Sequence, residues 1–149
     1  MATIRGGAKL ANALRELSRK IANPATLRVG FLEKSKYPDG TPVAMIAAIN
    51  EYGAPSRGQP PRPFFRNMIR DKQGEWPAAI AGLLRSHDMD AAEALDDAGE
   101  AIEGQLRQSI NDLTDPPLAE STIRRKGFDK PLIDTTNMIN SVAHEVKKG

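Results

Sequence analysis

The 149-residue sequence contains no cysteine. This absence excludes a disulfide framework, a thiol nucleophile and a zinc–thiolate site, and it fits a protein that folds in a reducing cytoplasm. The longest uninterrupted apolar stretch, Val43 to Ile49, is far shorter than the ~20 residues that span a bilayer. No apolar signal-sequence core follows Met1. We therefore expect a soluble protein that makes no contact with a membrane.

The length suits one domain covering residues 1–149, which is large enough to bury a hydrophobic core. Leucine and isoleucine recur at helical spacing over residues 7–22 and predict an amphipathic helix, which Asn23-Pro24 ends. Residues 26–32 alternate apolar and polar side chains and predict a strand with one buried face. A tight turn is expected at residues 37–40 because Pro, Asp and Gly follow one another there.

Proline and glycine divide the middle of the chain. Pro42 is expected to open a short helix that ends at Gly53, and the proline-rich residues 54–63 are expected to form an extended loop. A further helix is predicted from Pro63, with an interruption or kink where Gly74 and Pro77 occur.

The second half of the chain begins with a capping-box pattern at residues 90–93, which predicts the start of a long helix that Asp115-Pro116-Pro117 ends. A short helix is expected at residues 118–125 and a terminal strand at residues 141–147. The predicted fold is α+β: a small antiparallel sheet packed with four or five helices and a Pro-rich extended loop at about residues 54–63.

Charge is segregated along the sequence although the formal net charge is only +2. Residues 88–115 carry nine acidic side chains against the single basic Arg107, whereas basic side chains gather in residues 57–72 and 124–130. This pattern is compatible with a solvated acidic helix beside basic loops. The interpretation we favour is a subunit whose acidic and basic faces dock onto copies of itself.

Catalytic patterns are weak throughout. His87 and His144 stand far apart without metal-ligand spacing, and the acidic residues of the long predicted helix also suit a solvated helix face. Gly6-Gly7-Ala8-Lys9 lacks the preceding strand and the spacing of a phosphate-binding loop. We predict that the protein is not an enzyme and has no catalytic, cofactor-binding or metal-binding residues.

Nucleic-acid binding is the second class of function. Arginines flank Phe64 and Phe65, an interleaving that resembles single-strand binders. A phenylalanine at the start of a helix is more often a core or interface residue, and aromatic residues make up only 5% of the chain. Sequence-specific binding is therefore not expected, and a DNA-binding accessory protein is kept as the weaker alternative.

Four short motifs occur in a particular order. Asn50-Glu51-Tyr52-Gly53 is followed by Pro61-Arg62-Pro63-Phe64-Phe65-Arg66, and later come Ser121 to Gly127 and Pro131-Leu132-Ile133-Asp134-Thr135. Over residues 40–143 the chain resembles the tail-completion and virion-morphogenesis proteins of tailed bacteriophages, the HK97-type and Mu-like neck and tail proteins. It departs from that pattern at Thr136, where the family has glycine, so Asp134-Thr135-Thr136 is expected to cap a helix instead.

The resemblance implies a structural subunit of the phage particle at the head–tail joint or the head-proximal end of the tail. A minor tail or capsid-associated structural protein is the alternative within the same class. The implied partners are copies of the chain in a ring, most simply six-fold, and neighbouring connector, tail terminator or tail tube proteins, with packaged DNA nearby. The implied location is the virion, and the host cytoplasm during assembly.

The proline-rich segment is the expected contact region. Such a segment cannot pair its backbone in regular structure, so we expect it to lie across a neighbouring subunit. The alternative is an internal loop covered by the chain's own core. Aromatic residues and arginine are enriched at interface cores, and the candidate interface residues are Tyr52, Arg57, Arg62, Phe64, Phe65 and Arg66.

Overall fold

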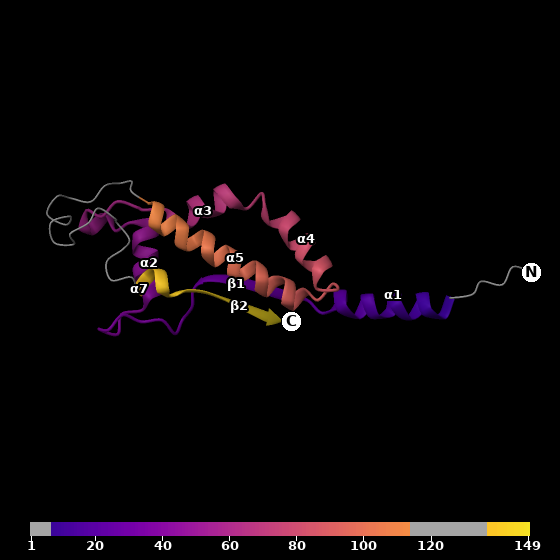
Figure 1. The fold of residues 1–149 in the computed structure, drawn as a ribbon. Coiled ribbons are helices and arrows are strands. Elements are labelled where there is room, and N and C mark those ends of the chain that lie inside the picture. Colours follow the sequence, from indigo (N-terminus) through magenta and orange to yellow (C-terminus); the bar gives the residue numbers. More distant parts are fainter. Residues whose placement is uncertain (1–6, 114–136) are drawn as a thin grey trace, which may run out of the picture.

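The computed structural model describes residues 7–113 and 137–149. Its sheet has two antiparallel strands, β1 (Ala25–Phe31) and β2 (Val142–Lys148), which pair from Ala25 opposite Lys148 to Phe31 opposite Val142. The long helix α5 (Ala91–Asp112) packs along this sheet, and α3 (Phe64–Lys72) and α4 (Trp76–Ser86) lie on the other side of α5 (Figure 1). The predicted α+β class and the antiparallel sheet are confirmed.

The remaining helices lie at the two ends of the body. Helix α2 (Val43–Tyr52) and the short α7 (Asn137–Asn140) lie together at one end, and α1 (Gly7–Ala22) extends away from the other end (Figure 1). The described residues thus contain six α-helices, one more than the upper figure expected. Four of the five expected helices fall within the described residues, and these four become six because Gly74 and Pro77 separate α3 from α4 and because α7 precedes β2.

Helix α5 supplies the centre of the core. Asp90 caps it, since one carboxylate oxygen accepts hydrogen bonds from the backbone N–H groups of Ala92 and Glu93 at 3.0 and 3.2 Å. The N-cap half of the predicted capping box is therefore present. The buried stripe of α5 meets side chains from α2, α3, α7 and β2, and the core contains Val43, Ala47, Phe64, Met68, Ile102, Leu106, Ile110, Met138 and Val142.

Both strands form where alternation predicts them. Leu27, Val29 and Phe31 pack against the core while Arg28 is exposed. The turn after β1 closes as expected, because the N–H of Gly40 donates to the carbonyl of Tyr37 at 2.9 Å. The predicted helix at residues 118–125, the motifs in residues 121–135 and the cap at residues 134–136 lie outside the described residues.

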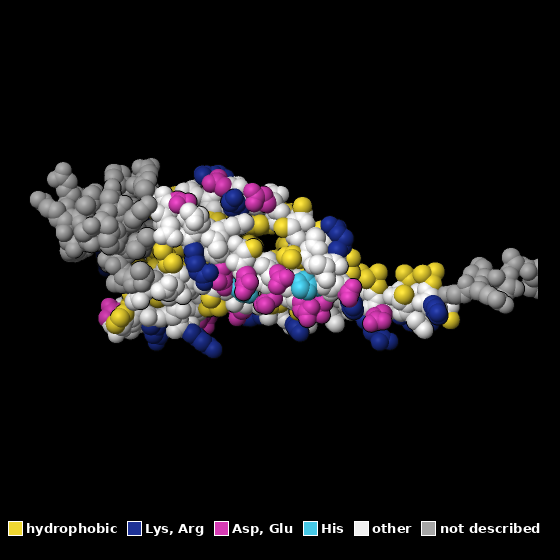
Figure 2. Space-filling view, in the orientation of Figure 1, with side chains coloured by type: hydrophobic (Ala, Val, Ile, Leu, Met, Phe, Trp, Pro, Cys, Tyr) yellow, Lys and Arg dark blue, Asp and Glu magenta, His cyan; other side chains and the backbone are white. Residues whose placement is uncertain are grey.

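Helix α1 forms but buries none of its side chains. Its alanine, leucine, lysine and arginine content gives it high helix propensity, and it ends before Pro24 as predicted. Its apolar stripe faces solvent, as the row of hydrophobic side chains along the projecting helix shows (Figure 2). The amphipathic pattern therefore correctly predicted the helix, but the body of the same chain does not cover the apolar face.

Candidate interaction surface

Glu51, the last charged residue of α2, caps the beginning of α3. Pro63 occupies the N-cap position of α3 and has no side-chain group that accepts a hydrogen bond. The Glu51 carboxylate accepts instead from the N–H of Phe65 at 2.9 Å and from the N–H of Arg66 at 3.1 Å. It is only 5% exposed, and its negative charge lies at the positive end of the helix dipole.

Arg66 joins the same cluster from the outside. Its Nε donates to Glu51 at 2.7 Å, and a terminal nitrogen donates to the Glu51 backbone carbonyl at 2.9 Å. Its guanidinium carbon also lies 5.2 Å from the centre of the Tyr52 ring, within the range of a cation–π contact. We name Glu51, Tyr52 and Arg66 the α2–α3 junction.

Gly53 allows the chain to turn back after α2. Its φ of 77° is a conformation that side chains disfavour, and an added Cβ would lie 2.7 Å from the Pro61 nitrogen and 2.8 Å from the Gln59 carbonyl oxygen. Gly53 is therefore required by close backbone packing. The predicted C′ glycine is confirmed as the residue that ends the helix, although its ψ of 175° is not that of a left-handed cap.

Residues 54–63 form a loop, as predicted, but part of this loop is regular and bonded to the body. Residues 55–57 form a 3-10 turn, and the N–H groups of Ala54 and Gln59 bond across its base. The Arg62 N–H then donates to the Asn50 carbonyl at 2.7 Å, and the Gln59 side chain donates to the Asn50 side chain at 3.1 Å. The loop is held against the end of α2 because the Asn50 backbone carbonyl accepts from the Arg62 N–H and the Asn50 side chain accepts from the Gln59 side chain.

The six candidate interface residues separate into two groups. Phe64 is 1% exposed and meets Phe31 edge to face at 6.1 Å between ring centres, so it is a core residue with no surface left for a neighbour. Phe65 is half-buried, and its ring packs against Gly30, where an added Cβ would lie 3.4 Å from the nearest ring carbon. Arg62 is only 8% exposed. Tyr52, Arg57 and Arg66 are exposed and remain available for contact.

Arg62 is unusual among the buried residues. The Nε of its side chain is buried without a hydrogen-bond partner, and no ion pair of Arg62 occurs among the described residues. Burial lowers the pKa of its guanidinium. Burial of this nitrogen without a hydrogen-bond partner carries a desolvation cost, which an acceptor supplied by another molecule would offset.

A second charged cluster joins β2 to α5. His144 lies beside Gly99, where an added Cβ would overlap the imidazole ring. The Nδ1 of His144 lies 2.6 Å from Glu103, and its Nε2 lies 3.0 Å from Asp96. Arg107 donates from one nitrogen to Glu103 at 2.6 Å and to the Val142 carbonyl at 2.7 Å.

The electrostatics of this cluster favour a structural clamp. Burial works against the charge on His144, but hydrogen bonds to Glu103 and Asp96 outweigh it and raise the pKa of the imidazole. Burial likewise opposes ionisation of Glu103, yet hydrogen bonds from His144 and Arg107 lower the pKa of the carboxyl. Both imidazole nitrogens face carboxylates, so this arrangement favours the protonated imidazole and ties both of its nitrogens to α5.

His87 forms a different set of contacts from those of His144. Its Nε2 lies 2.7 Å from Asp97 and its Nδ1 lies 3.3 Å from Glu93, on the exposed side of the α4–α5 turn. The hydrogen bond to Asp97 raises the pKa of His87. No group of three or more metal-ligating side chains within residues 7–113 and 137–149 is arranged to hold a metal ion.

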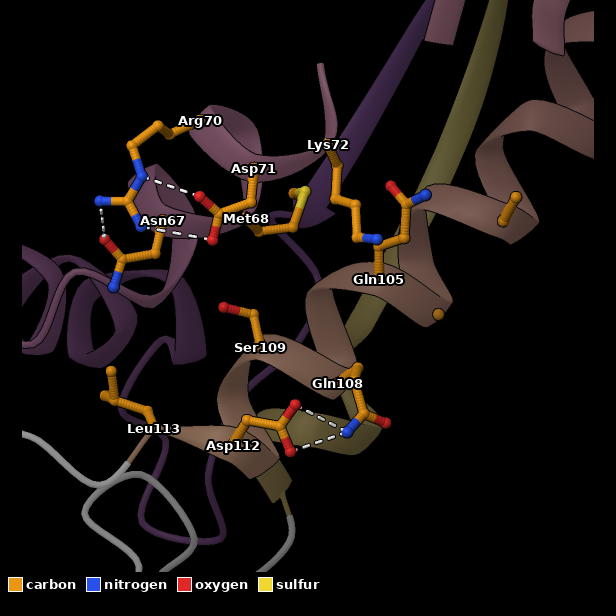
Figure 3. Close-up of a pocket in the computed structure, with 12 residues that line it drawn as sticks. Asn67, Met68, Arg70, Asp71, Lys72, Gln105, Gln108, Ser109, Asp112 and Leu113 are labelled. Carbon is orange, nitrogen blue, oxygen red and sulfur yellow. Dashed lines mark hydrogen bonds and ion pairs between the residues drawn. The ribbon is translucent and has the colours of Figure 1, made fainter. Parts of the chain in front are cut away.

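A cleft of about 570 Å³ lies between α3 and α5 (Figure 3). Its walls are mostly polar, and several of these side chains bond to neighbours on their own helix rather than toward the cleft. Arg70 donates to Asp71 at 2.8 Å and to Asn67 at 3.2 Å, and Gln108 donates to Asp112 at 2.7 Å. The cleft thus lacks the convergent unpaired groups that typically hold a small ligand.

Sequence reasoning missed the role of Glu51 and the clamp around His144. Two signals were available. Pro63 cannot cap the helix that it begins, so another acceptor was required. Gly99 lies in the interior of a helix, where a glycine indicates that another part of the chain packs closely against the backbone. Within the described residues, no helix is long and apolar enough to cross a membrane. No protein-family model, no curated protein and no solved structure matches this chain.

Proposed function

We propose that the protein is a non-enzymatic structural subunit of a tailed phage particle, located at the head–tail joint or the head-proximal end of the tail. The observation that carries this proposal is the α2–α3 junction. Two of the motifs on which the resemblance rests meet there, because Glu51 of the first motif caps the helix that the second motif begins. The residues of the two motifs thus form one structural unit, and this unit provides the surface on which the proposal rests.

The surface of the junction suits a contact between proteins. Tyr52 is 67% exposed and is held against Arg66, while Arg57 is exposed on the adjoining 3-10 turn. Tyrosine and arginine are the residue types most enriched among interface side chains that dominate binding. Glu51 fixes the position of Arg66 and the end of α2 beside it, so Tyr52 loses little freedom on binding.

The chemistry of the described residues fits the same assignment. His144, for example, has both imidazole nitrogens bonded to carboxylates of α5, as suits a residue that joins β2 to that helix. The proposed partners are copies of the chain arranged in a ring, together with connector, tail terminator or tail tube proteins. The proposed location is the virion, with assembly in the host cytoplasm.

Deletion of the gene from the phage that encodes it tests the proposal. We expect lysates with DNA-filled heads and tails that are not joined, and infectivity restored by the wild-type protein supplied in trans. Tyr52→Ser should fail to restore joining, whereas Ser56→Ala, an exposed change on the same loop, should restore it. Complete infectious particles from the deletion, or absence of the protein from purified particles by mass spectrometry, would overturn the proposal.

A further inference from the structure

The large apolar side chains that the described residues expose lie on two helices only. Exposed apolar residues occur singly on most protein surfaces, but a contiguous row of them marks a contact site. Helix α1 exposes four and helix α2 exposes two, with exposed fractions of 62% for Leu10, 56% for Leu14, 38% for Leu17, 67% for Ile21, 49% for Met45 and 67% for Tyr52.

The spacing on α1 is that of a helix-packing seam. Its exposed leucines and isoleucine follow one another at intervals of four, three and four residues, which matches the a and d positions of a heptad. Such a stripe is narrower than the apolar face of a helix that lies in a membrane surface, and α1 carries no aromatic residue. The seam therefore fits a second helix.

Helix α2 presents a surface of the matching kind. One side of it contributes Val43 and Ala47 to the core, and the other side exposes Met45, Ala48 and Tyr52, again at intervals of three and four residues. Its only charged residue, Glu51, is buried. A helix that is apolar on all sides is normally covered on all sides, and the outer face of α2 has no such cover among residues 7–113 and 137–149.

The two faces lie at opposite ends of the molecule, so one chain cannot bring them together (Figure 1). We propose that the apolar seam of α1 docks on the outer face of α2 in a second copy of this chain. Each copy then contacts one neighbour through its α1 and the other neighbour through its α2. Such a head-to-tail contact gives a ring where the rotation between copies closes. The closed ring rests on the proposed function, whereas the contact itself does not.

Charge argues against the alternative in which two α1 helices pair. Each α1 carries Lys9, Arg15, Arg19 and Lys20 against Glu16, so four positive charges and one negative charge leave +3. Two such helices repel each other, whereas α2 itself exposes no charged side chain and only Arg66 of α3 lies beside its outer face, at Tyr52. The acidic side of α5 would attract α1, but it exposes no large apolar side chain to receive the seam.

The contact is small. Helix α1 is about 24 Å long and about 10 Å wide, so one face of it covers less than the ~800 Å² per partner of a stable interface. A single contact should therefore dissociate in dilute solution and persist only where many copies close a ring. Because the core of the contact is apolar, high salt should preserve it, in contrast to binding of α1 to nucleic acid or to an acidic surface.

The absence of cysteine allows a direct test in the full-length protein. Leu14→Cys and Met45→Cys are prepared separately, mixed at high concentration and treated with a short bis-maleimide. The buffer contains about 0.5 M salt, at which the Debye length lies between ~3 and ~10 Å and charge–charge attraction is screened. We expect cross-linked dimer from the mixture and not from either variant alone. Asn12→Cys on the opposite face of α1, mixed with Met45→Cys, is the matched control and should give little dimer.

Each result decides the proposal. All three positions are exposed, so the variants should melt like the wild type, and a Leu14→Ser change should weaken self-association about tenfold or more. Equal cross-linking of Leu14→Cys alone would show pairing of α1 with α1 and overturn the proposal. Absence of cross-links in the mixture would overturn it too. Neither failure touches the assignment to the particle, which the deletion experiment tests independently.

Discussion

Glu51 and Arg66 lie on different helices, yet the Arg66 guanidinium Nε is 2.7 Å from a carboxylate oxygen whose charge also caps the helix on which Arg66 stands. The relationship has two parts of unequal strength. The ion pair has a partly exposed arginine, whereas the hydrogen bonds from the backbone of α3 are shielded by burial of the glutamate. The backbone contacts should therefore dominate the stabilisation.

The first prediction separates those two parts. Glu51→Ala should lower the free energy of unfolding by about 2–3 kcal/mol, because it removes the cap and leaves buried N–H groups without an acceptor. Arg66→Ala should cost less than about 1 kcal/mol, because the cap remains. Urea unfolding of both variants measures the difference. Equal losses would show that the ion pair, and not the cap, stabilises the junction.

The second prediction concerns the glycines on either side of the 3-10 turn. Gly53→Ala should destabilise the protein by about 3 kcal/mol or more. The new methyl group would clash with the Pro61 nitrogen and the Gln59 carbonyl, and alanine disfavours the positive φ at this position. Gly58 also has positive φ, at 64°, but open space around it, so Gly58→Ala should cost only about 1 kcal/mol. Thermal melting of the pair compares a closely packed glycine, with a ψ of 175°, with an unpacked one in the left-handed helical region, with a ψ of 20°.

These local effects show where sequence reasoning succeeds. The helix at residues 7–22 and the strand at residues 26–32 follow from the periodicity of neighbouring side chains, and the cap at Asp90 follows from its residue type. Each signal is contained within one element. Contacts between one element and another carry no such signal, as when Asn50 of α2 bonds to Gln59 and Arg62 of the Pro-rich loop.

The candidate site was predictable in composition but not in arrangement. The motif around Tyr52 and Arg66 identified the exposed residues of the junction, but it could not show that Phe64 turns into the core. A phenylalanine pair at a helix start suits either a core or an interface, and only the rotation of α3 relative to α5 decides which ring is buried. The charges of His144 and Glu103 were likewise visible, while their contact depends on β2 crossing α5.

The third prediction is a pH dependence of stability. The pKa of His144 is raised in the folded protein, so its contribution is fully present below its unfolded pKa of about 6.5 and is lost as pH rises through the folded value. The lowered pKa of Glu103 makes the opposite contribution, which is lost only as pH falls through that lowered value. We therefore expect stability to decline from about pH 6.5 upward.

A matched pair of variants shows which histidine causes this decline of stability with pH. His144→Gln should flatten the dependence of the melting temperature on pH above neutrality, because the titrating group inside the clamp is gone. His87→Gln removes the other histidine with a raised pKa, which is exposed on the α4–α5 turn, and should leave most of the decline in place. A profile that is flattened by His87→Gln alone would contradict the assignment to the clamp.

The last prediction concerns Arg62, whose buried Nε has no hydrogen-bond partner. Replacing a buried, unpaired charge by an apolar side chain of similar length removes a desolvation cost while keeping the packing. Arg62→Met should therefore unfold at the same urea concentration as the wild type or at a higher one. Arg62→Ala should unfold earlier, because it also leaves a cavity beside the Pro-rich loop.

The same two variants then test why an arginine stands there. If a partner in the particle supplies the missing acceptor, Arg62→Met should fold at least as well as the wild type and still fail to join heads to tails. An Arg62→Lys change keeps the charge but not the planar guanidinium, and it should restore joining only in part. Normal joining by Arg62→Met would show that the guanidinium has no role in assembly, and a large loss of stability in that variant would show that the free chain already provides a partner for it.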